Sequence, residues 1–168
     1  LRAVNRRLKD TCGQEMQGLL RPMGAVNLTL PHWEQDVEDC GTFGFEGVRI
    51  FPAWHRVPLS DERMQTLCRI CEEKGLLLQI YSRMEDPRTE HPLFQTEIVD
   101  FKPALELLPK YPKLRVLFSN SAAEIRPPQA AQLAKCGQVY FDTSMIEQTG
   151  GVAAYAAATS PERLVLGS

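Results

Sequence analysis

LLLQIYSRMEDPR, residues 76–88, decides the fold, because an apolar run passes directly into a dense polar one. The apolar run follows Gly75 and is interrupted only by Gln79, which is typical of a strand buried on both faces in a parallel sheet covered by helices. The polar run then lies at the carboxyl end of that strand, where parallel α/β folds hold their ligands. We therefore expect residues 81–88 to border the functional site.

The rest of the chain repeats this pattern of a buried strand followed by a polar tip and a helix. Further strands are predicted at residues 20–28, 48–51, 114–118, 139–141 and 164–166. Right-handed crossovers allow either a doubly wound open sheet or part of a (β/α)8 barrel. Polar tips follow nearly every strand, which favours a ring of loops around one site. We predict an α/β fold of the (β/α)8 TIM-barrel type.

Length and composition are those of one domain that spans residues 1–168. A complete barrel needs about 250 residues, so we expect the chain to be truncated at both ends. The net charge of −2 gives no reason to expect nucleic acid or an anionic membrane as a partner. No apolar run is long enough to span a bilayer and no signal peptide is recognisable, but missing targeting signals say little about a truncated chain. The odd number of cysteines, without a disulfide framework, leads us to expect a cytoplasmic protein.

The five cysteines are an odd number, which argues against a disulfide framework. Cys68 and Cys71 form a nominal CxxC pair, but Met64, Leu67, Cys68 and Cys71 have the spacing of one buried helix face. No second cysteine pair or nearby histidine completes a zinc site. We interpret these cysteines as core residues.

Four ordered pieces of the chain resemble the amidohydrolase superfamily, in its amidohydrolase-related (amidohydrolase-2) branch. They are Gly47-Val48-Arg49-Ile50-Phe51-Pro52, residues 76–88, Val139-Tyr140-Phe141-Asp142-Thr143-Ser144 and Pro161-Glu162-Arg163-Leu164-Val165-Leu166-Gly167-Ser168. The resemblance implies a (β/α)8 barrel of which strands three to eight are represented here. It also implies hydrolysis, or decarboxylation in some branches, that depends on a divalent metal such as zinc at the carboxyl-terminal mouth.

The chain departs from the family pattern at the metal ligands. The family's His-x-His would precede Leu1, and its catalytic aspartate would follow Ser168. Tyr81 occupies the position of a metal-binding histidine on the fifth strand, and the sixth strand ends in Ser119-Asn120-Ser121 without one. Neutral imidazole is a good zinc ligand, whereas a phenol and an amide are poor ones. Either the metal is held mainly by residues outside this chain, or it is absent.

Two residues are predicted to be catalytic. His55 follows the strand at 48–51, and its ring could shuttle a proton or bind a metal, or it could be a loop residue stacked near Trp54. Asp142 ends the strand at 139–141 and could be a base, an outer partner of the metal site or the cap of the next helix.

Five residues are predicted to bind substrate, namely Tyr81, Arg83, Asp86, Arg88 and Asn120. Forked arginine donors suit a carboxylate or phosphate of a ligand. The alternative is an internal ion-pair cluster that pins the long loop. Between the two, we favour a structural pairing of Asp86 with Arg88, with Arg83 directed to the mouth.

The leading hypothesis is a metal-dependent hydrolase or related decarboxylase that acts on a small carboxylate- or lactone-like substrate. The alternative is a metal-free barrel that binds a small molecule without catalysis. Neither nucleic acid nor a membrane is expected as a partner, and a homo-oligomer stays open.

Overall fold

Six parallel strands form one sheet in sequential order, β1-β2-β3-β4-β5-β6. The computed structural model describes residues 1–14, 19–84, 88, 91, 93 and 96–167. The strands are β1 Met23–Ala25, β2 Gly47–Ile50, β3 Leu77–Tyr81, β4 Arg115–Ser119, β5 Gln138–Asp142 and β6 Leu164–Val165. A doubly wound sheet reverses its strand order at a switch point, and this sheet does not. The predicted barrel topology is confirmed as a partial barrel.

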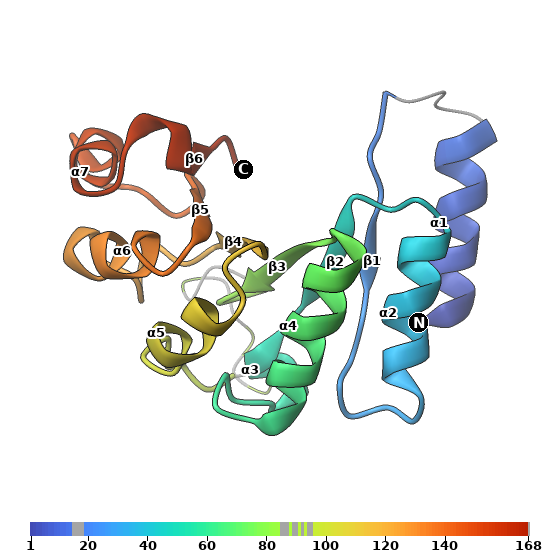
Figure 1. Cartoon of the computed structure of the whole chain (residues 1–168). Helices are drawn as coiled ribbons and strands as arrows, with labels where there is room; N and C mark the ends of the chain where they lie inside the picture. Colours follow the sequence, from blue (N-terminus) through green and yellow to red (C-terminus); the bar gives the residue numbers. More distant parts are fainter. Residues whose placement is uncertain (15–18, 85–87, 89–90, 92, 94–95, 168) are drawn as a thin grey trace.

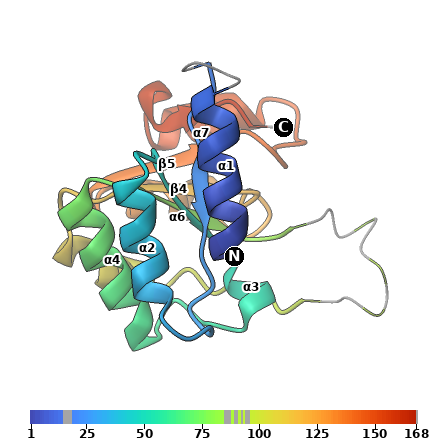
Figure 2. The same ribbon diagram turned by 90° about the vertical axis from the view of Figure 1, so that its right-hand side faces the viewer.

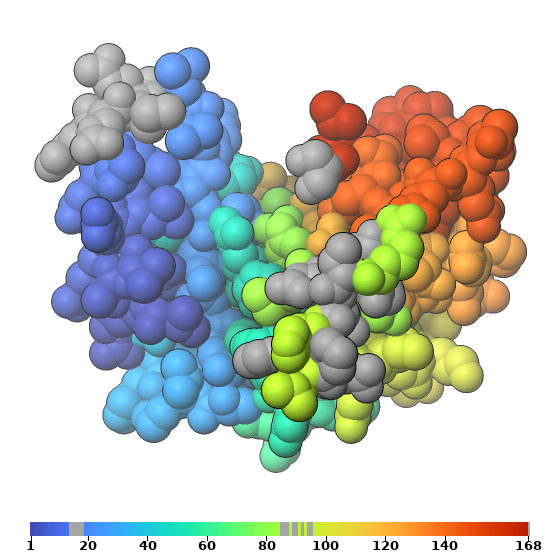
Figure 3. Space-filling model, turned by 180° about the vertical axis from the view of Figure 1, so that it is seen from behind, coloured from blue at the N-terminus to red at the C-terminus, as the bar shows by residue number. Residues whose placement is uncertain are grey.

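The connecting helices lie along the outside of the curved sheet (Figure 1). They are α2 Trp33–Thr42, α4 Glu62–Lys74, α5 Ala104–Leu107, α6 Pro127–Ala134 and α7 Gly151–Ala158, with 3-10 turns at Leu108–Lys110 and Pro161–Arg163. The short helix α3 Pro52–His55 follows the carboxyl end of β2 and lies apart from α2 and α4 (Figure 2). Sequential strand order with right-handed crossovers places these connections on one face of a sheet. From behind, the N-terminal and C-terminal parts stand apart with a hollow between them (Figure 3). Among the described residues, every helix is too short or too polar to cross a bilayer.

The core lies between the sheet and the helices, because alternate strand residues point to the helix side. Leu78, Ile80, Phe118 and Phe141 are fully buried there, and the rings of Phe118 and Phe141 stack at 5.9 Å. Residues of the opposite face, such as Gln79, are only half-buried. The prediction that both faces of the strand at 77–81 are buried is therefore wrong, since only its helix-facing side is fully buried.

The CxxC cysteines are core residues, as predicted. Cys68 and Cys71 are both buried and free on the inner face of α4. Burial raises the pKa of the Cys68 thiol to about 12, so it stays protonated at pH 7.

The helix α1, Arg2–Gln14, covers the exposed edge of the sheet (Figure 2). Asn5 donates a hydrogen bond to the carbonyl oxygen of Ala25 and accepts one from its N–H, both at 3.0 Å. These two bonds replace the ladder bonds that the edge of β1 lacks. Arg2 also forms an ion pair with Asp36, which joins α1 to α2.

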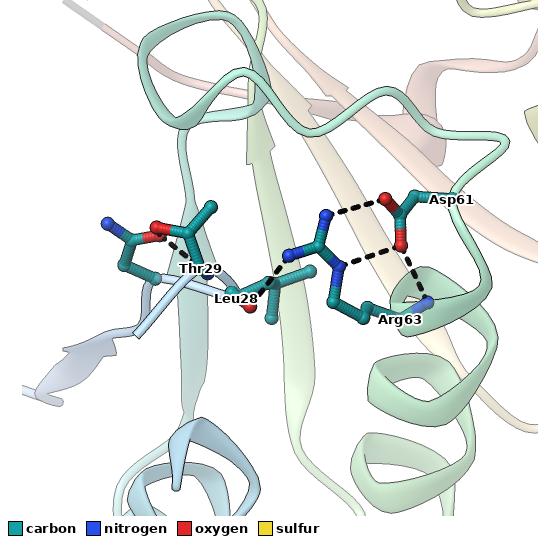
Figure 4. A network of polar contacts seen from close by, with 5 residues as sticks. Leu28, Thr29, Asp61 and Arg63 are labelled. Atoms are coloured by element: carbon teal, nitrogen blue, oxygen red, sulfur yellow. Dashed lines mark hydrogen bonds and ion pairs between the residues drawn. The ribbon is translucent and has the colours of Figure 1, made fainter. Parts of the chain in front are cut away.

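Asp61 joins the start of α4 to the loop that follows β1 (Figure 4). Its carboxylate accepts hydrogen bonds from the backbone N–H of Arg63 at 2.9 Å and from the Arg63 guanidinium at 2.6 and 2.8 Å. The same guanidinium donates to the carbonyl oxygen of Leu28 at 3.2 Å. The hydrogen bonds from the Arg63 side chain are the main reason why the pKa of Asp61 falls to about 2.

Replacement of this helix cap is expected to weaken the fold in a pH-dependent way. Asp61→Ala should lower the free energy of unfolding at pH 7 by about 1 kcal/mol, since a capping carboxylate is lost. The folded-state pKa lies below the ordinary value of 3.8, so the contribution is full above about pH 4 and vanishes as the pH falls toward 2. Urea unfolding across this range measures it. Ser60→Ala, at the exposed neighbouring position, should leave stability unchanged.

Candidate functional site

The carboxyl ends of β2 to β5 bring together side chains that are far apart in the sequence. Tyr81 pairs with Ser119 in the strand register, and Asp142 pairs with Val165 on the next strand. The predicted residues His55, Tyr81, Arg83, Asn120 and Asp142 all follow or end these strands. Asp86 lies outside the described residues.

An aromatic group occupies the β2–β3 side of this mouth. The ring of Phe51 stacks on Tyr81 at 4.9 Å and meets the ring of His55 edge-on at 6.0 Å. His55 is held there by α3, a short helix begun by Pro52 that the sequence analysis did not predict. The ring contact of His55 in the structure is with Phe51, whereas the sequence analysis considered stacking on Trp54 as the non-catalytic interpretation.

Burial lowers the pKa of His55 below its usual 6.5, because the charged imidazole loses water. His55 is therefore neutral at pH 7. The unfolded chain binds the proton more readily, so the free energy of unfolding should fall as the pH drops from 7 through 6.5 toward the folded-state pKa.

Urea unfolding between pH 5 and 8 tests this expectation. His55→Gln should flatten the slope below pH 7, since the variant has no group to titrate at this position. His32→Asn, at an exposed position with a left-handed backbone that asparagine tolerates, should keep the slope. An unaltered slope in His55→Gln would contradict the shifted pKa.

Tyr81 lies at the position where the family resemblance implies a ligand, and its hydroxyl is engaged by Gln79. Its hydroxyl oxygen accepts a hydrogen bond from Gln79 Nε2 at 3.1 Å. The same nitrogen donates to Ser119 Oγ at 3.0 Å. Gln79 thereby ties the tip of β3 to the tip of β4.

Asn120 and Asp142 form a polar network across β4 and β5. The backbone N–H of Asn120 donates to both carboxylate oxygens of Asp142, at 3.2 and 3.3 Å. The Ser144 hydroxyl lies 2.6 Å from Asp142 Oδ1 and 2.7 Å from Asn120 Oδ1. Asn120 has a φ of 52°, a left-handed conformation that asparagine tolerates better than most residues. Asp142 does not cap α7, whose N-cap is Gly150.

The Arg83 side chain forms an ion pair with Glu124, which follows β4. Its Nε donates to Glu124 Oε1 at 2.6 Å, and Ser82 Oγ donates to the other carboxylate oxygen at 2.7 Å. Only its backbone carbonyl takes part in the mouth network, where it accepts from Asn120 Nδ2 at 3.0 Å. The role of Arg83 in substrate binding stays a prediction, and Arg83 also borders a small pocket beside Phe51 and Tyr81.

Arg88 is exposed and pairs with Glu147 across the mouth. The predicted pairing of Asp86 with Arg88 falls on residues outside the described ones. The ion pair with Glu147 links the loop after β3 to the loop after β5. Substrate binding by Arg88 stays a prediction.

Arg49 is a further candidate site residue, which was not predicted from the sequence. It lies between Ala25 and Gln79 in the strand register, on the face opposite the buried Val48 and Ile50. In the described part of the chain its Nε is buried without a hydrogen-bond partner, and its Nη2 reaches the Met23 carbonyl at only 3.4 Å. A cation in mid-strand was the available signal, since such a donor costs about 1–3 kcal/mol unless something accepts from it.

The described residues do not form a metal site by themselves. No three His, Cys, Asp or Glu side chains among them are placed to hold an ion. Tyr81 accepts a hydrogen bond from Gln79, and a neutral phenol is a poor ligand. The residues present do not fit the metal that the resemblance implies, and zinc is not supported by them.

Comparisons with known proteins agree on the fold. A model of the amidohydrolase family matches residues 2–168. No curated protein matches the chain. Solved structures match it at low identity, which shows the fold alone, and the chain spans less than two thirds of their length.

Three of these solved structures show which proteins the fold is similar to. An uncharacterised TIM-barrel protein of Bordetella bronchiseptica has a TM-score of 0.73 at 15% identity, over 98% of this chain and 58% of that one. The 2,6-dihydroxybenzoate decarboxylase of Rhizobium has a TM-score of 0.69 at 13% identity, over 98% and 64%. The manganese-bound 5-carboxyvanillate decarboxylase of Novosphingobium aromaticivorans has a TM-score of 0.67 at 16% identity, over 98% and 58%.

Proposed function

Because the chain belongs to the amidohydrolase family, we propose that the protein is an enzyme that removes the carboxyl group of a small aromatic carboxylate. The observation that carries the proposal is Arg49, whose buried Nε lacks an acceptor on the open face of the sheet. A substrate carboxylate would supply that acceptor in a charge-assisted hydrogen bond. The other reaction that this site could perform is hydrolysis of a small carboxylate- or lactone-like molecule.

Each group at the mouth then has a role. Arg49 binds the carboxylate, while Tyr81 and Asn120 orient the ring substituents by hydrogen bonds. The Asp142 carboxylate takes a proton from solvent and passes it to the ring carbon. The bond between the ring and the carboxylate breaks, its electron pair stays on the ring, and carbon dioxide leaves. His55, neutral at pH 7, exchanges protons on the Phe51 side of the mouth.

A relative of this fold binds manganese, and a divalent metal would supply a Lewis acid that polarises the substrate. Its ligands would have to come largely from outside the described residues of this chain. The proposed steps above use only groups of this chain.

A second function, binding of a small molecule without turnover, is favoured by the absence of a metal-holding cluster among the described residues. One experiment separates the two. The whole protein that contains this chain is incubated with 2,6-dihydroxybenzoate or 5-carboxyvanillate, with and without added Mn²⁺, and carbon dioxide release is measured. Turnover supports the enzyme. Saturable binding without release of carbon dioxide supports the binding protein. The absence of both turnover and binding would reject both functions.

A further inference from the structure

A cavity of about 580 Å³ lies between the segment around α5 and the helix α6. One wall is the segment that leads into α5, with Val99, Phe101 and Leu105. The opposite wall is α6 and the turn before it, with Ile125 and Leu133. The residues that line the cavity lie between the end of β3 and the end of α6. Strands β3 and β4 each have a neighbouring strand on both sides within this chain.

The polar end of this cavity is the ion pair of Arg83 with Glu124. The two side chains are only 17% and 6% exposed, so the pair is largely shielded from water. Both Glu124 oxygens are already satisfied, one by Arg83 Nε and one by the Ser82 hydroxyl. Among the described residues, no acceptor is bonded to either Nη of Arg83. The outer edge of the guanidinium fork therefore stays open.

The amide of Gln129 adds a second donor. Its Oε1 accepts a hydrogen bond from the backbone N–H of Arg126 at 2.8 Å, so its amino group is the part that remains for a ligand. The exposed Asp100, Lys102 and Gln132 also line the cavity, and Asp100 Oδ1 accepts a hydrogen bond from the Lys102 N–H at 3.0 Å. The donors available to an anion are therefore Arg83, Gln129 and Lys102, beside apolar walls. Such a site matches a ligand with an apolar body and an acceptor head.

We propose that this cavity binds a small monocarboxylate with an aromatic or short aliphatic body. Its volume falls within the range of about 300–1,000 Å³ that is usual for small-molecule sites. A carboxylate can accept two parallel hydrogen bonds from the Nη edge of Arg83, which a neutral carbonyl cannot match. The proposal does not depend on the reaction proposed for the mouth.

The site is connected to the mouth through one residue. The Arg83 side chain lines the cavity, while its carbonyl accepts from Asn120, whose N–H donates to Asp142. A ligand that repositions Arg83 would act on Asp142 through two hydrogen bonds. The binding itself is the point to test.

Phenylacetate is the probe, titrated by calorimetry into the whole protein that contains this chain, with phenylacetamide as the neutral counterpart. Phenylacetate should bind saturably and at least about tenfold more tightly than the amide. Gln132→Trp, which fills the cavity from an exposed position, should weaken binding at least about tenfold. Arg83→Lys, which keeps the charge but loses the fork, should also weaken it.

Lys135→Trp is the matched control, because Lys135 is exposed at the end of the same helix and does not line the cavity. It should bind phenylacetate as the unaltered protein does. Three results would overturn the proposal: no saturable binding, equal binding of the amide, or binding that persists unchanged in Gln132→Trp. The last result would assign the binding to the mouth, so it leaves the proposed reaction intact.

Discussion

Gly47→Ala is expected to lower the free energy of unfolding by about 3 kcal/mol or more, because the sheet has no room for a β carbon there. That carbon would lie 2.1 Å from the carbonyl oxygen of Leu77, which is backbone and cannot rotate away. Gly47 and Leu77 are register partners, so β2 and β3 would have to move apart. The shift would also displace Arg49 from Gln79, two residues further along the ladder.

Gly13→Ala is the control for this prediction. Nothing lies within 4 Å of the added carbon, and the residue lies in α1. The change should stabilise the protein by about 0.5–1 kcal/mol, since alanine loses less backbone entropy in a helix. Urea unfolding of both variants decides the matter. A Gly47→Ala variant within 1 kcal/mol of the unaltered protein would show that the strands tolerate the contact.

Asp142→Asn is expected to reduce kcat for the proposed decarboxylation by about 10²–10⁴-fold, the usual effect of losing a positioned proton donor. Stability should change little, because the amide keeps an oxygen that can accept from the Asn120 N–H. KM should change less than kcat, since binding of the carboxylate is assigned to Arg49. Steady-state rates of carbon dioxide release measure both.

Asp10→Asn is the control, because Asp10 is exposed on α1, far along the chain from the mouth. It should leave kcat unchanged. If Asp142→Asn also keeps its rate, the carboxylate only supports the turn at Asn120 and the proton must come from elsewhere. Gly167→Ala offers a related check, as its β carbon would lie 2.8 Å from Asp142 Cβ and would push that side chain aside.

The local elements could be read from the sequence because each is specified by neighbouring residues. Gly75 ends α4 in a left-handed conformation, and the apolar run after it becomes β3. The strand predicted at 20–28 is shorter, Met23–Ala25, since Pro22 lies before it and no partner extends it. The helix α3 was missed because one turn has no detectable periodicity.

The candidate site was predicted in part. Strand ends are local features, so Tyr81, Asn120 and Asp142 could be assigned to one mouth once the strands were parallel. The partner of Arg83 was not predicted, because Glu124 is 41 residues away and no pattern in the chain links the two. Arg49 was missed for the same reason, since its lack of an acceptor is a property of its packed surroundings.

By itself, the sequence determined the alternation of buried strands and helices and the polar ends that follow the strands, since periodicity and caps act over a few residues. Only the tertiary structure decided that Arg83 pairs with Glu124 and that the Arg49 Nε has no acceptor among the described residues. Both depend on contacts between segments that meet only when the sheet curves. Burial strengthens such contacts and penalises an unsatisfied donor, and no single stretch of sequence records that balance.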